Sequence, residues 1–269
     1  MVSSTMQQNQ SSQEDKRQFP SSTSVAFLWL KNEIVAWIKE PAAVLLNMAY
    51  PLLMLAFLFV IGGSAVRNNT DIITPAVALL ALTGVLMVGI NLPANGINEV
   101  RQGDFYYYLR TLPTGASTRL VAWSGAPFLL AILSAFVGIG VGTIFSSARF
   151  TFSQVGLLFL VFCAFGVFTT AIGVCFGFVL SNRTSLAVSL GLSFVLLLLS
   201  GAREITTLPT VLDVTAKILP STAAVELCHS ILTGVRGSGW WVVSLIIWAS
   251  LALLMATVAI RRDENSKFS

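Results

Sequence analysis

The chain has 269 residues, of which 55% are hydrophobic and 10% charged, and its mean hydropathy is +0.80. This composition excludes an ordinary soluble domain and is typical of a protein that crosses a membrane several times. The formal net charge is +4. Because the sequence has no basic stripe interleaved with aromatic residues, we expect no nucleic-acid partner.

The N-terminal part of the chain predicts a tail followed by a surface helix. Residues 1–24 are rich in Gln, Ser and charge without periodicity, so we expect a disordered cytoplasmic tail. Residues 25–41 place apolar side chains on one helical face and charged side chains on another, with tryptophans suited to the headgroup level. This pattern predicts an interfacial amphipathic helix. The alternative is that the segment only starts the first span, although its charges and Pro41 argue against this.

Six apolar runs follow the surface helix. They cover residues 42–61, 72–92, 120–144, 155–180, 185–200 and 240–260. A helix needs about 20 residues to cross the hydrocarbon core, and all runs except the fifth reach that length. We therefore expect an all-α integral membrane protein with six transmembrane helices in residues 42–260. Residues 261–269 would form a second cytoplasmic tail.

The fifth run and the segment after it do not follow the pattern of a simple transmembrane helix. The run has 16 residues, about 24 Å as a helix, which is shorter than the membrane core. Within residues 201–234, apolar side chains recur at helical spacing from Leu208 to Leu219, with Asp213 and Lys217 on the other side.

Prolines and a glycine set the expected bounds of two short helices in this segment. Pro209 suits a first helical turn and Pro220 ends that helix. A second helix over residues 222–233 would use Gly234 as its C-terminal cap. A short span followed by two half-buried helices predicts a re-entrant hairpin, which needs protein or a watery cavity beside it. We expect this hairpin to form a gate on the outer side of the membrane. The residues expected at this outer gate are Gly201, Arg203, Glu204, Pro209 and Pro220.

The distribution of basic residues predicts the orientation, since cytoplasmic loops carry more Lys and Arg. With six crossings, the inner side holds Lys16, Arg17, Lys31, Lys39, Arg101, Arg110, Arg119, Arg183, Arg261, Arg262 and Lys267. The outer side holds Arg67, Arg149, Arg203, Lys217 and Arg236. This excess places both termini in the cytoplasm, provided that residues 201–234 do not cross the membrane.

The longest cytoplasmic connection, residues 93–119, combines a dense charge cluster with three consecutive tyrosines, Tyr106, Tyr107 and Tyr108. A solvated cap on two spans is one interpretation. Three exposed tyrosines in one turn suit water poorly, however, and tyrosine is enriched at protein interfaces. We therefore expect this loop to bind a partner protein.

Three parts of the chain resemble the membrane subunit of ABC-2 type ABC transporters. The stretch Asn98-Glu99-Val100-Arg101-Gln102-Gly103, followed by Leu109, Leu112 and Pro113, resembles that family's cytoplasmic loop, where a coupling helix meets the ATPase. The helix Phe27–Glu40, with Pro41 and a first span bearing Pro51, resembles the family's elbow helix and its entry. The pairs Ser200-Gly201, Leu208-Pro209 and Leu219-Pro220 resemble its outer re-entrant helices.

The resemblance implies a permease subunit of an exporter in a bacterial inner membrane, without an ATPase site of its own. It would pair with a second permease half, as a homo- or heterodimer, and with a nucleotide-binding ATPase subunit that holds the ATP and Mg²⁺. The chain has no phosphate-binding loop, which agrees with that arrangement. The ATPase-coupling residues implied in this way are Glu99, Arg101, Gly103, Tyr106, Tyr107, Tyr108, Arg110 and Pro113.

The substrate is not defined by any motif. A pathway lined by Phe57, Phe162 and Phe165 would suit apolar or amphipathic cargo, drug-like or lipid, but these side chains could equally face lipid or pack between helices. A polysaccharide or glycolipid exporter is an alternative, as is a membrane scaffold without transport. An intramembrane enzyme acting on lipids fits least, because no acidic pair, metal cluster or Ser/His arrangement is present. Membrane lipids are expected partners in each case.

Overall fold

The computed structural model describes residues 22–39, 41–103, 106, 116–205, 210–235, 237 and 239–265, and the regular elements among them are all helices. In chain order these are α2 (Ser22–Lys39), α3 (Pro41–Arg67), α4 (Thr70–Gln102), α6 (Ala116–Phe145), α7 (Phe152–Val179), α8 (Asn182–Ile205), α9 (Thr210–Ile218), α10 (Pro220–Thr233) and α11 (Gly239–Asn265). Most of the expected N-terminal tail lies outside the described residues. So do Tyr107, Tyr108, Arg110, Pro113 and Pro209.

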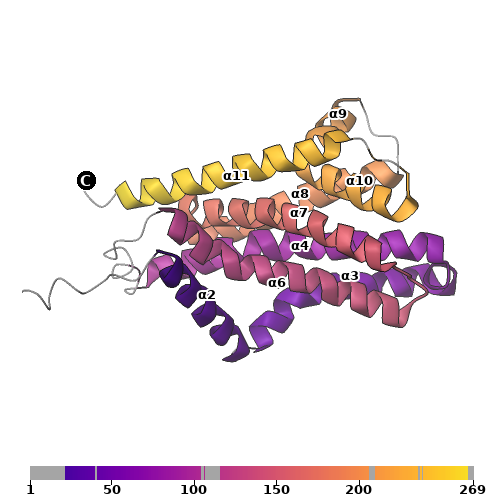
Figure 1. Cartoon of the computed structure of the whole chain (residues 1–269), viewed down its shortest axis with the longest axis horizontal. Helices are drawn as coiled ribbons and strands as arrows, with labels where there is room; N and C mark the ends of the chain where they lie inside the picture. The colour runs from indigo at the N-terminus through magenta and orange to yellow at the C-terminus, as the bar shows by residue number, and fades with distance from the viewer. Residues whose placement is uncertain are drawn as a thin grey trace, which may run out of the picture.

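The long helices run along one bundle axis (Figure 1). The C-termini of α4, α7 and α11 lie at one end, which we call the loop end, because the loop after α4 leaves there. The helices α9 and α10 lie at the opposite end, which we call the hairpin end. Helix α2 is inclined to the bundle and packs on α6.

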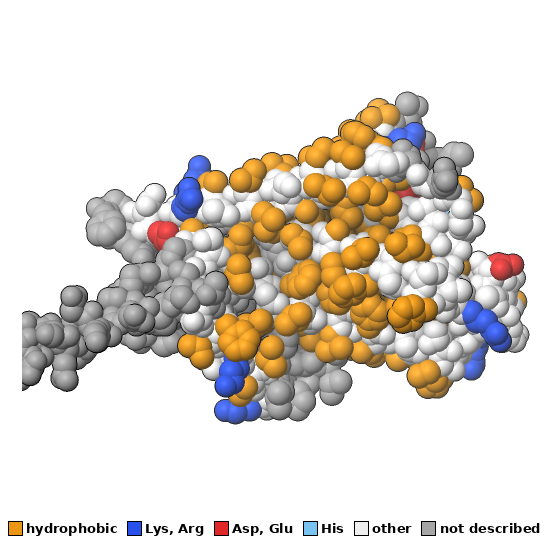
Figure 2. Space-filling model, in the orientation of Figure 1, with side chains coloured by type: hydrophobic (Ala, Val, Ile, Leu, Met, Phe, Trp, Pro, Cys, Tyr) orange, Lys and Arg blue, Asp and Glu red, His pale blue; other side chains and the backbone are white. Residues whose placement is uncertain are grey.

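Five helices, α4, α6, α7, α8 and α11, are long and apolar enough to cross a membrane. On the face that Figure 2 shows, hydrophobic side chains cover the middle of the bundle, whereas Lys, Arg, Asp and Glu lie towards its margins. An apolar surface of this kind is what a hydrocarbon core requires. The chain therefore has the character of a helical multi-pass membrane protein. The first expected span falls in α3, which contains Pro51 and is kinked at Gly63, where the backbone leaves helical geometry (φ 55°). The apolar part of α3 described here, Pro51–Arg67, is shorter than the five helices above.

Helix α8 differs from the short fifth span expected from the sequence. It does not end at Ser200, where the apolar run ends, but continues to Ile205 and has 24 residues. The added residues include Ala, Arg and Glu, which are good helix formers, and one Gly in a helix costs only about 1 kcal/mol. The end of an apolar run therefore marked the end of the apolar surface, not the end of the helix.

Helix α11 likewise continues past the expected boundary at Ile260, through residues that were expected to form a tail, and ends at Asn265. It therefore carries Arg261, Arg262, Asp263 and Glu264 as its last helical turns. Charged side chains do not prevent the hydrogen bonds of a helical backbone, and Arg and Glu have high helix propensity. This extension brings two acidic residues to the loop end.

Helix α4 lies at the centre of the bundle, where it packs against α3, α6, α7, α8 and α10. In its 18-residue apolar window, 72% of the residues are buried, compared with 28% for α8 and 33% for α11. Close contact between α4 and α7 depends on glycine: a Cβ on Gly173 would lie 2.5 Å from the carbonyl oxygen of Ile90. Small residues at such crossings let two backbones approach.

Candidate functional site

Arg101 organises the loop end of the bundle. From the last turn of α4, its Nη1 donates hydrogen bonds to the carbonyl oxygens of Gly177 and Phe178, both at 2.9 Å. The last carbonyls of a helix have no partner within the helix, and a cation there also favours the helix dipole. The guanidinium carbon lies 5.7 Å from the centre of the Phe178 ring. Arg101 therefore caps the C-terminus of α7.

Asp263 joins Arg101 to the loop. Its Oδ1 lies 3.3 Å from Arg101 Nη2, and its Oδ2 accepts a short hydrogen bond from the Tyr106 hydroxyl. The Asp263 side chain is 8% exposed and Tyr106 is 6% exposed. Hydrogen bonds to a charged partner are the stronger kind, and burial limits screening by water. The loop is thus attached to the end of α11.

A second ion pair lies beside the first. Arg119, near the start of α6, lies 3.5 Å from the Glu264 carboxylate. We call these five residues, Arg101, Tyr106, Arg119, Asp263 and Glu264, the Asp263 cluster. It connects the ends of α4, α7 and α11 with the start of α6.

Two of the predicted coupling residues therefore lie together but point inward. Arg101 and Tyr106 bind Asp263, whereas Glu99 and Gly103 are exposed on the same stretch of chain. Asp263 and Glu264 were not predicted as site residues. A signal for them exists in the sequence, because acidic residues in the last turn of a helix oppose its dipole and therefore need cationic partners.

At the hairpin end, the start of α10 is buried and contacts α8, whereas the exposed end of α9 contacts α11. The Ser221 hydroxyl donates to the carbonyl oxygen of Leu196 at 3.0 Å, and Trp248 Nε1 donates to that of Ile218 at 2.7 Å. Leu196 precedes the end of α8 by nine residues, and Trp248 follows the start of α11 by nine. At 1.5 Å per residue, both contacts lie about 13 Å from those helix ends.

The remaining predicted gate residues lie around the junction between α9 and α10. Pro220 is buried at the first position of α10, and Gly234 ends that helix in the left-handed conformation (φ 71°), as predicted for a C-terminal cap. Asp213 and Lys217 form an ion pair at 2.6 Å on α9. Gly201, Arg203 and Glu204 belong to α8, but their side chains lie outside the description.

The aromatic residues expected along a pathway occupy different environments. Phe162 and Phe165 are fully buried in α7, where Phe162 packs edge-on against Phe136 and Phe165 stacks on Phe168. Phe57 on α3 is 61% exposed. Within this chain, Phe162 and Phe165 are therefore packed in the interior, and Phe57 is on the surface.

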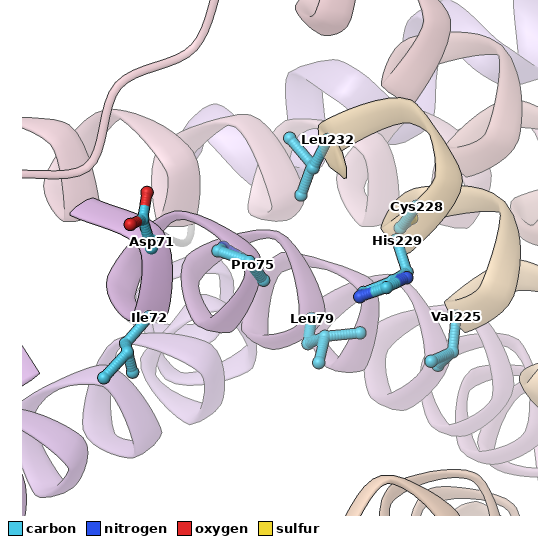
Figure 3. A pocket seen from close by; sticks show the side chains of 8 residues that line it. All are labelled: Asp71, Ile72, Pro75, Leu79, Val225, Cys228, His229 and Leu232. Atoms are coloured by element: carbon cyan, nitrogen blue, oxygen red, sulfur yellow. The ribbon is translucent and has the colours of Figure 1, made fainter. Parts of the chain in front are cut away.

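A groove of about 170 Å³ lies between the start of α4 and helix α10 at the hairpin end. Figure 3 shows its lining: Asp71, Ile72, Pro75, Leu79, Val225, Cys228, His229 and Leu232. Its walls are mostly apolar, with Asp71 towards one end and His229 towards the other. Among the described residues, no three His, Cys, Asp or Glu side chains are placed to hold a metal ion.

Comparison with known protein families and curated proteins finds no family model and no relative that matches the chain. The functional argument therefore depends on the geometry of the two bundle ends.

Proposed function

We propose that this chain is the membrane permease subunit of an ATP-driven ABC-2 type exporter, powered by a separate ATPase subunit. The observation that carries the proposal is the placement of two distinct segments at opposite ends of one bundle (Figure 1). Tyr106, in the loop after α4, binds the Asp263 cluster at the ends of α4, α7 and α11, and at the other end α10 packs against α4, α7, α8 and α11 beside α9. Energy would enter at the first segment and the substrate would leave past the second.

The charges of the described residues support the loop end as the cytoplasmic one. That end carries Arg101, Arg119, Arg183, Arg261 and Arg262, and the hairpin end carries Arg67, Arg149 and Lys217. The excess of basic residues agrees with the positive-inside rule. With α3 as a sixth span, both termini lie in the cytoplasm of a bacterial cell, and the hairpin is an outer re-entrant element.

A second permease half, identical or related, completes the pathway in this proposal. Re-entrant backbone at membrane depth needs protein or a cavity beside it, and α8 and α11 leave most of their apolar windows uncovered within one chain. We expect the complex with the ATPase to contain two permease chains. Mass measurement of the detergent-solubilised complex tests this, and a single permease chain per ATPase-bound complex would contradict it.

The proposed substrate is apolar or amphipathic, drug-like or lipid. The six apolar runs contain no Asp, Glu, Lys, Arg or His, so a pathway between them offers few partners to a strongly polar cargo. Export of a polysaccharide or glycolipid is the alternative. A scaffold without transport is the second alternative.

Reconstitution into liposomes with a phosphate-loop ATPase encoded beside this chain tests the proposal. We expect the permease to stimulate ATP hydrolysis and to move a fluorescent amphipath or a labelled lipid only when ATP is present. An ATPase whose phosphate-loop Lys is replaced by Ala serves as the control, because it binds the permease without turnover. An ATPase that assembles with the chain but moves no cargo would favour the scaffold.

A further inference from the structure

We propose that α7 and α11 form a stiff link between the loop and the hairpin, and that Asp263 is the positioning residue that fastens the loop to this link. The inference rests on the proposed function and adds a route by which ATPase binding at one end would move the gate at the other. Six hydrogen bonds carry it, four at the loop end of the helix pair and two at the hairpin end.

At the loop end, both helices of the pair are attached to Arg101. Arg101 bonds to the last carbonyls of α7 and to Asp263 of α11, and Asp263 in turn binds Tyr106 of the loop. A displacement of Tyr106 therefore acts directly on α11, and through Arg101 on α7. Because Asp263 and Tyr106 have little exposure to solvent, water cannot easily replace these hydrogen bonds.

At the hairpin end, the same two helices contact the hairpin near both ends of α10. Trp248 of α11 donates to the carbonyl oxygen of Ile218, the last residue of α9, at 2.7 Å. Gln154 of α7 donates to the carbonyl oxygen of Leu232, near the end of α10, at 3.4 Å. Movement of the α7–α11 pair therefore carries both ends of α10 with it.

Between these ends, α7 and α11 pack along much of their length. Phe168 of α7 meets Trp248 of α11 edge to face, with ring centres 6.2 Å apart. On the C-terminal side of this contact, α11 buries small residues at helical spacing, which permits close approach of the two helices. These residues are Ala252, Ala256 and Ala259. Trp248 and Asp263 are 15 residues apart on one helix, about 22 Å of rise. Close-packed helices transmit displacement over this distance, because interiors have low compressibility.

Spatial continuity alone does not establish coupling, so the test measures it. The native cysteines Cys163, Cys175 and Cys228 are replaced, and Lys217→Cys on exposed α9 becomes the reporter. A membrane-impermeant thiol reagent is applied with the ATPase bound, without nucleotide and after trapping with ATP and vanadate. In the otherwise wild-type chain we expect the labelling rate to differ by at least threefold between the two states.

Asp263→Asn should abolish this difference while the ATPase still co-purifies, because the amide keeps the shape but loses the charge that holds Arg101. Trp248→Phe, which removes the N–H donor at the other end and reduces the ring that meets Phe168, should also abolish it. Glu264→Gln is the matched control: it neutralises the adjacent acid, whose partner is Arg119 of α6, and should preserve the difference. If Asp263→Asn does not fold, Tyr106→Phe replaces it in the same comparison.

The outcomes separate the two proposals. A chain that binds no ATPase and moves no cargo overturns the proposed function and the link together. A functional exporter in which Asp263→Asn and Trp248→Phe keep the full labelling difference overturns only the link. Loss of the difference in Glu264→Gln as well would assign the effect to general disturbance of this end and would also overturn the specific role of Asp263.

Discussion

At Gly173 the backbones of α4 and α7 lie close together. A Cβ there would lie 2.5 Å from the Ile90 carbonyl oxygen and 2.9 Å from that of Gly89, and neither backbone atom can rotate away. We expect Gly173→Ala to destabilise the fold by about 1–3 kcal/mol, the usual range for overpacking. Thermal unfolding in detergent measures the effect.

Gly156 provides the control on the same helix. A Cβ at Gly156 would meet nothing within 4 Å, so Gly156→Ala should be neutral or stabilising, because Ala has the higher helix propensity. Equal melting temperatures for the two variants would contradict the close approach of α4 and α7.

Arg101 should not tolerate replacement by lysine. The planar guanidinium bonds to two carbonyls of α7 and to Asp263 at once, a geometry that a lysine ammonium on a flexible stem cannot reproduce. Since the Arg101 side chain is 28% exposed, we expect a moderate loss of about 1–2 kcal/mol, measured by thermal unfolding. Arg183→Lys, at an exposed position in α8, should have no effect. Equal stability of both variants would show that Arg101 acts only through its charge.

In the hairpin, we expect α9 to be exposed to water and the first turn of α10 to be buried. In a background without native cysteines, Lys217→Cys should react with a membrane-impermeant thiol reagent added to intact cells. Thr222→Cys should not react, because Thr222 is 1% exposed in the first turn of α10. Mass spectrometry of the purified chain measures both.

Labelling of the Lys217→Cys variant only after the cells are opened would place α9 on the cytoplasmic side. The segment between α8 and α11 would then contain a crossing, and the hairpin would not be an outer element. Opened cells also provide the positive control for reagent access.

For the whole molecule, the number of membrane crossings decides whether the two termini lie on the same side. Five crossings place the termini on opposite sides, whereas a sixth crossing by α3 places them on the same side. We expect a fluorescent protein that folds only in the cytoplasm to be active when fused to either terminus. Alkaline phosphatase, active only outside the cytoplasm, should be active when inserted after Arg149, between α6 and α7. Phosphatase activity at the N-terminus would exclude α3 as a span.

The sequence predicted the elements better than their ends. The apolar runs located α4, α6, α7 and α11, since about 20 apolar residues have few alternatives to a buried helix. The prolines and Gly234 located α9 and α10, because these residues restrict the backbone locally. The helices α8 and α11 extend beyond the expected spans, since helical hydrogen bonding continues where apolarity stops.

The candidate site, too, was only partly predictable from the sequence. The sequence by itself determined the membrane character and the two short helices of the hairpin, because each follows from local composition or spacing. Only the tertiary structure decided that Arg101 and Tyr106 turn inward to Asp263, since Arg101 and Asp263 lie 162 residues apart in the chain. The packing of α4 against α7 and α11 brings them together, and periodicity within a helix carries no information about which helix will be its neighbour.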